Sequence, residues 1–214
     1  MDFMKIIKSL EQLLYELMVW LVFYPLTLWR AVFRPLKLMD YAEDELDDAE
    51  EDRYSDTLSP PIFLALSLGV IRLIELAEGW NEQLGVLSDD ANYMAFRVVS
   101  FAFFPLMMAL RLLRSRGERL DRKNLRLPFY AQCFIAAPFA IGINIGAMAM
   151  SGGAGLGVGL SFVGATVLWY IVVQTLWFRR ELRIGYLRGF GKAMRAFLEA
   201  ILLSIALSSA VDPF

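Results

Sequence analysis

Seven polar side chains lie inside long apolar stretches of this sequence. They are Arg72, Glu75, Arg97, Asn144, Gln132, Gln174 and Glu199. An ionisable or amide group is costly in such surroundings unless it meets a partner or water. These groups could form the two half-sites of a transport path, or they could pair with one another and hold helices together. The residue types alone leave both interpretations open.

Counting depth along helices of alternating direction divides these side chains into two layers. The outer layer contains Arg72, Glu75, Arg97 and Asn144. The inner, cytoplasmic layer contains Gln132, Gln174 and Glu199. We expect Arg97 to pair with Glu75, because an unpaired charge at that depth would cost about 3 kcal/mol.

The chain has no histidine and a single cysteine, Cys133. This excludes an intrachain disulfide, a zinc site of the usual ligand types, and Ser/His or Cys/His catalytic units. Cys133 has apolar neighbours and is expected to be a small core residue rather than a reactive thiol. We expect no cofactor. An enzyme is the least favoured class, because Ser59, Ser100 and Glu199 have no adjacent base or metal ligand.

The composition places the chain in a membrane. Hydrophobic residues make up 57% of its 214 residues and the mean hydropathy is +0.49, so lipid is the expected solvent. Helices satisfy the backbone of apolar runs long enough to cross the hydrocarbon core. We predict an all-α, polytopic membrane helix bundle of about five spans. The predicted spans cover about residues 60–77, 92–112, 128–150, 155–178 and 194–211.

Residues 3–36 are predicted to form a further helix, interrupted in its second half by Pro25. Glu16 within the run, many Trp and Tyr residues, and bases at both ends favour a helix that lies in the interface or re-enters it. A sixth span is the alternative. The domain prediction is an amphipathic interfacial helix at 1–39, an acidic cytosolic linker at 40–58 and a five-span transmembrane domain at 59–214.

The linker concentrates negative charge. Ten of the 23 acidic residues lie between Asp40 and Asp56, where Arg53 is the only base. A calcium loop is the alternative, but the spacing lacks the central glycine and ordered ligands of an EF-hand. A solvated linker with nothing to bury is favoured. It is expected either to associate loosely, in a salt-sensitive way, with arginine-rich loops or to remain a free tether.

The loops after the second and fourth predicted spans carry most of the bases and should be cytoplasmic by the positive-inside rule. The loops at 79–92 and 151–157 contain no base and belong outside. The expected location is a bacterial inner membrane, with the N-terminus cytoplasmic and the C-terminus external. The bases should face anionic lipid rather than nucleic acid. They are Arg114, Arg116, Arg119, Arg122, Lys123, Arg126, Arg179, Arg180, Arg183 and Arg188.

Glycines recur at four-residue spacing, which lets helix backbones approach closely. The pairs are Gly142 with Gly146, Gly153 with Gly157, and Gly155 with Gly159. Because the intervening connection is very short, we expect the third and fourth spans to pack as a tight hairpin. Homodimerisation through the same glycines is the alternative.

The junction into the first span reads Asp56-Thr-Leu-Ser-Pro-Pro-Ile-Phe-Leu-Ala-Leu66. It resembles the pattern of Asp, an apolar or aromatic residue, a small residue, Pro, an aromatic residue and Ala with which the Yip family of membrane proteins begins its first span. The larger plan is also similar: a cytosolic N-terminal region and five closely spaced helices, the third opening with Tyr130 and carrying Pro138. The resemblance covers about residues 56–211.

The chain departs from the eukaryotic Yip pattern by having Leu58-Ser59 where that pattern has Tyr-Gly. The resemblance implies a membrane fold of five spans. Eukaryotic members are linked to Rab GTPases, which is not carried over to this chain. Bacterial members are often loosely called permeases.

Two function classes follow. The first is a non-enzymatic membrane-organising or accessory protein that binds lipid and another membrane protein or a second copy of itself. The second is a small-solute or lipid transporter, or a channel, that uses the two polar layers. A continuous wet path between the layers would favour transport. A closed bundle with a broad exposed apolar groove would favour assembly.

Overall fold

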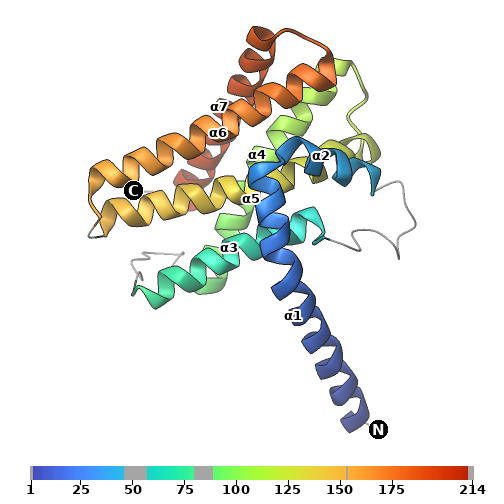
Figure 1. Cartoon of the computed structure of the whole chain (residues 1–214), viewed down its shortest axis with the longest axis vertical. Helices are drawn as coiled ribbons and strands as arrows, with labels where there is room; N and C mark the ends of the chain where they lie inside the picture. Colours follow the sequence, from blue (N-terminus) through green and yellow to red (C-terminus); the bar gives the residue numbers. More distant parts are fainter. Residues whose placement is uncertain (1, 46–56, 80–88, 153, 212–214) are drawn as a thin grey trace.

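The computed structural model describes residues 2–45, 57–79, 89–152 and 154–211, and every regular element in these ranges is an α-helix (Figure 1). The helices are α1 (Asp2–Phe33), α2 (Pro35–Asp44), α3 (Pro60–Ala77), α4 (Asp90–Arg116), α5 (Arg122–Ser151), α6 (Leu156–Leu182) and α7 (Tyr186–Val211). All except α2 are long and apolar enough to cross a membrane. The predicted all-α membrane bundle is confirmed, and α1 adds a sixth candidate to the five predicted spans.

The predicted spans correspond to α3 through α7, but four of the helices continue past the apolar segment at their arginine-rich ends. Polar caps set these ends. Gly117 ends α4 in the left-handed conformation, at φ 70°, and the Asp121 carboxylate begins α5 by accepting a hydrogen bond from the Asn124 amide at 2.8 Å. Hydropathy marks the part of a helix that suits hydrocarbon, whereas caps mark where the backbone stops being helical.

The N-terminal region is two helices rather than the single helix predicted over residues 3–36. Helix α1 runs unbroken through Pro25, where the interruption was expected, and the break falls at Arg34. Arg34 has φ −134° and ψ 51°, outside the helical region, and Pro35 opens α2. A residue before proline is pushed out of the helical region, and proline suits the first position of a new helix.

Helix α5 occupies the middle of the bundle and packs against α1, α2, α3, α4 and α6, while α7 packs against α4 and α6 (Figure 1). The α4–α5 and α6–α7 connections meet at one end, where Arg116 donates to the Glu181 carboxylate at 2.6 Å. We call this the basic end. The end of α3, the start of α4, the end of α5 and the start of α6 belong to the opposite end.

Five aromatic side chains from four helices form the middle of the core, and we call them the aromatic cluster. They are Phe101, Phe104, Phe139, Tyr170 and Phe197. The Phe139 ring is central, with its centroid 4.4 Å from that of Tyr170 and 5.0 Å from that of Phe104. Nearby, Cys133 is fully buried, as expected for a core residue.

Helices α5 and α6 form the close hairpin that the glycines predicted. A Cβ atom on Gly159 would lie 2.7 Å from the Gly146 carbonyl oxygen, and one on Gly142 would lie 2.4 Å from the Thr166 hydroxyl oxygen. Gly155 and Gly157 instead face open space, so they have no part in this contact. Gly153 lies outside the described residues.

The acidic linker begins later than predicted and is not free at its ends. Residues 40–44 belong to α2, where Ala42 is fully buried, and Thr57 and Leu58 are buried just before α3. The Thr57 hydroxyl donates to the Tyr41 hydroxyl at 3.4 Å, which closes α2 onto the chain that leads into α3. The expectation that 40–58 buries nothing is therefore wrong at both ends. Residues 46–56 lie outside the described part.

The two halves of α1 have different surroundings. Tyr24 donates to the Ser67 hydroxyl of α3 at 3.2 Å, and Trp169 of α6 donates to the Val32 carbonyl at 3.3 Å, so the second half is held by the bundle. Large apolar side chains of the N-terminal part of α1, from Met4 to Val22, are exposed, and we call this part the first half. This half projects beyond the bundle and runs steeply across the direction of α3, α5 and α6 (Figure 1).

Candidate functional site

The predicted outer layer is a real cluster that joins three helices. Arg72 and Glu75 lie one turn apart on α3, Arg97 lies on α4 and Asn144 lies on α5. Arg97 donates to the Glu75 carboxylate at 2.7 Å and to the Asn144 side-chain oxygen at 2.6 Å. Arg97 and Glu75 are only 4% and 6% exposed. The expected pairing of Arg97 with Glu75 is therefore confirmed.

Two further residues complete this outer cluster and were not identified from the sequence. Asp90 accepts a hydrogen bond from Arg72 at 2.5 Å, and the Arg72 and Arg97 guanidinium carbons lie 4.9 and 5.2 Å from the Tyr93 ring centroid. Asp90 and Tyr93 fall in the first turn of α4, at the edge of the segment assigned to a loop. The two arginines thus face two carboxylates and a shared aromatic face, which balances the charge locally.

The inner layer is a closed pair of amides rather than a group of three. Gln132 of α5 donates to the Gln174 oxygen at 2.9 Å, and Gln174 of α6 donates back to the Gln132 oxygen at 2.6 Å. Both residues are fully buried. A reciprocal amide pair satisfies one donor and one acceptor on each side chain. It also fixes which face of α5 packs against α6.

Glu199 does not join the two glutamines as the depth count suggested. It accepts a hydrogen bond from Arg111 of α4, in a close ion pair between α4 and α7. Depth along a helix does not say which neighbour a side chain faces, and α7 packs against α4 as well as α6. Arg111 lies within α4, which continues as helix to Arg116.

The basic end contains carboxylates as well as bases. Arg180 donates to Asp40 of α2 at 2.8 Å through one nitrogen and contacts it through a second, so one acid of the predicted linker does meet an arginine-rich loop. Arg116 and Arg180 both contact Glu181. These two bases therefore have protein partners and are not simply lipid-facing as predicted.

Glu43 of α2 lies half-buried beside these charges. Burial, followed by the nearby Glu181 carboxylate, raises the pKa of Glu43 from 4.5 to about 7, although Arg116 and Arg180 act in the opposite direction. Because this pKa is close to physiological pH, the packing of α2 against the bundle is expected to depend on pH.

Buried, small or aromatic side chains separate the outer cluster from the inner amide pair. Gln132 and Asn144 lie twelve residues apart on α5, which corresponds to about 18 Å along the helix and about a third of a turn around it. Ala136 and Ala140 lie between these two residues along the helix and are 0% and 1% exposed. The aromatic cluster packs at this level, so the two polar layers are separated by apolar core.

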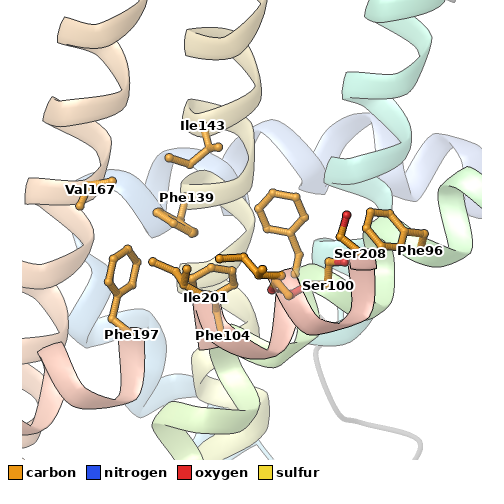
Figure 2. A pocket seen from close by; sticks show the side chains of 12 residues that line it. Phe96, Ser100, Phe104, Phe139, Ile143, Val167, Phe197, Ile201 and Ser208 are labelled. Carbon is orange, nitrogen blue, oxygen red and sulfur yellow. Dashed lines mark hydrogen bonds between the residues drawn. The ribbon is translucent and has the colours of Figure 1, made fainter. Parts of the chain in front are cut away.

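An apolar groove of about 440 Å³ opens between α4, α5, α6 and α7 (Figure 2). Phe104, Phe139 and Phe197 of the aromatic cluster line it together with Val167 and Ile201, and serines lie along it at Ser100 and Ser208 (Figure 2). The lining is almost entirely carbon. A groove of this kind suits hydrocarbon rather than an ion or a polar solute.

Metal chemistry has no support within the described ranges, where no three His, Cys, Asp or Glu side chains meet in a group that could hold a metal ion. No family model, curated protein or solved structure matches the chain.

Proposed function

We propose that this protein is a non-enzymatic organiser or accessory protein of a membrane complex. The observation that carries the proposal is the closed core. The outer cluster pairs its charges internally, the inner glutamines pair with each other, and buried Ala136, Ala140 and the aromatic cluster lie between them. A transport path requires wet polar groups that a solute can reach, and these groups are already engaged.

The first half of α1 is the surface we assign to a partner protein. Its large apolar side chains are exposed along one broad face of the helix, with Leu14 at 53% and Leu21 at 80%, and they contribute nothing to the bundle core. In lipid, helices associate through shape and packing of such surfaces.

Photo-crosslinking in native membranes tests the proposal. A photoreactive residue replaces Leu14 or Leu21 of α1, and the matched control replaces Leu168 of α6, which is 66% exposed. We expect one discrete protein adduct of the same mass from both α1 positions and only lipid adducts from Leu168. Lipid adducts alone at all three positions would contradict the proposal.

The transporter is the second candidate class, and the apolar groove is the observation that favours it. A groove of about 440 Å³ between four helices could hold one acyl chain of a lipid in transit. Movement of labelled lipid between leaflets of proteoliposomes, lost when Val167→Trp fills the groove, would support this class over the organiser.

A further inference from the structure

A second groove, at the basic end, combines charge with apolar surface. It has a volume of about 800 Å³ and lies between α4 and the first two turns of α5. The residues that define this basic groove are Arg122, Lys123, Arg126, Leu106, Phe129 and Tyr130. We propose that it binds the phosphodiester headgroup of one anionic glycerophospholipid, with an acyl chain along Leu106 and Phe129.

The three bases lack carboxylate partners in the described part of the chain. The two acids of the adjacent connection have other contacts. Glu118 lies 3.6 Å from Arg116, and both carboxylate oxygens of Asp121 accept hydrogen bonds from Asn124. Arg122, Lys123 and Arg126 are all exposed. Their charge is therefore available to an anion from outside the protein.

The position of these bases at a helix N-terminus makes an external anion more favourable. The positive end of the α5 dipole disfavours Arg122 and Lys123 in its first turn, where the N-cap carboxylate of Asp121 is engaged with Asn124. An anion held there interacts favourably with the side chains of the bases and with the positive end of the helix dipole. The proposal therefore accounts for a placement that costs stability in the protein alone.

The apolar side of the groove distinguishes a lipid from a free anion. Phe129 and Tyr130 follow the bases within two turns, and Leu106 faces them from α4. The Arg126 guanidinium carbon lies 5.3 Å from the Tyr130 ring centroid, which holds the base at the level of an aromatic residue typical of membrane interfaces. A phosphate bound to these bases would have its lipid chains directed at carbon surface.

Native mass spectrometry of the full chain in detergent tests the site by titration with dioleoyl-phosphatidylglycerol, dioleoyl-phosphatidylcholine or inorganic phosphate. The test variant is Arg122→Gln with Arg126→Gln. The charge-matched control is Arg183→Gln with Arg188→Gln, two exposed bases of the other connection at the basic end. Loss of two membrane-surface bases should weaken phosphatidylglycerol binding by the test variant about tenfold or more.

We expect the control variant and all phosphatidylcholine titrations to remain unaffected by these substitutions. Equal loss in the two double variants would mean diffuse surface charge, and no loss in the test variant would mean no site; either result overturns the proposal. Phe129→Ala should weaken binding of phosphatidylglycerol but not of inorganic phosphate. Displacement of the lipid by inorganic phosphate, with Phe129→Ala having no effect, would assign the groove to a free anion and also overturn it.

Discussion

Arg97 on α4 donates to Glu75 on α3 at 2.7 Å, in a contact buried to 5% and 8% side-chain exposure. The pair joins two helices whose direct packing is slight compared with what each makes on α5. The second Arg97 nitrogen donates a hydrogen bond to Asn144 of α5, which connects the pair to the middle of the bundle. This triangle is the polar link that holds α3 in place.

Glu75→Gln should destabilise the protein strongly. It leaves Arg97 buried without its carboxylate, and loss of one partner of a buried ion pair costs about 3–5 kcal/mol. Reversible unfolding in mixed micelles measures the loss, with Glu118→Gln as an exposed control. Adding Arg97→Gln to Glu75→Gln should recover part of the loss, because the charge left without its carboxylate is then removed, while the buried Arg72 keeps Asp90 as its partner; equal stability of Glu75→Gln and the parent would contradict this role.

The amide pair should behave differently from the ion pair. Gln132→Leu leaves the Gln174 amide buried without a partner, which should cost about 1–2 kcal/mol. The double variant Gln132→Leu with Gln174→Leu removes both amides and should be less destabilised than the sum of the two single variants. The same unfolding assay on all four proteins gives the coupling energy, and strictly additive losses would mean that the two side chains do not interact.

Contact between α5 and α6 provides a steric test. A Cβ on Gly159 would meet backbone atoms of both Gly146 and Met150 at 2.7 Å, whereas one on Gly157 would meet nothing. Gly159→Ala should therefore cost about 1–3 kcal/mol by forcing the helices apart. Gly157→Ala, two residues away, should leave the free energy of unfolding unchanged or slightly raised. Equal effects of the two substitutions would contradict the close hairpin.

The stability of α2 packing against the bundle should depend on pH through Glu43. Its pKa is raised from 4.5 to about 7 in the folded protein, chiefly by burial. The stability that the neutral carboxyl contributes is thus fully present below pH 4.5 and is lost as pH rises through about 7. Hydrogen exchange of the α2 amides should be slower at pH 5 than at pH 8 after correction for intrinsic rates, and Glu43→Gln should abolish the difference, whereas the exposed Glu11→Gln should not.

The sequence was most informative where depth in the membrane decides the contact. Arg97 and Glu75 were predicted to meet because alternating helix direction places them at the same level, and a buried charge needs a partner. The same count failed for Glu199, because the choice between α4 and the α5–α6 pair depends on how α7 is rotated. Asp90 and Tyr93 were missed since a polar residue at the edge of a span resembles a loop residue.

Local backbone chemistry explains the remaining differences. Two prolines lie near the end of the N-terminal helical region, and either could have interrupted it. Helix α1 continues through Pro25, as apolar helices often do when their neighbours compensate for the missing hydrogen bond, whereas Arg34 leaves the helical region before Pro35. The burial of Ala42 and Leu58 could not be seen in an acidic composition, because it depends on α5 as the surface that receives α2.

The closed core can be tested without knowing any substrate, by cysteine accessibility in proteoliposomes. In a Cys133→Ala background, single cysteines replace Ala136 and Ala140 between the polar layers, and Ala154 in the exposed α5–α6 connection serves as the reactive control. A charged methanethiosulfonate reagent supplied on both sides should modify Ala154→Cys and leave Ala136→Cys and Ala140→Cys unmodified. Modification of both core cysteines at rates comparable to the control would demonstrate a wet path between the layers and contradict the closed bundle on which the organiser function rests.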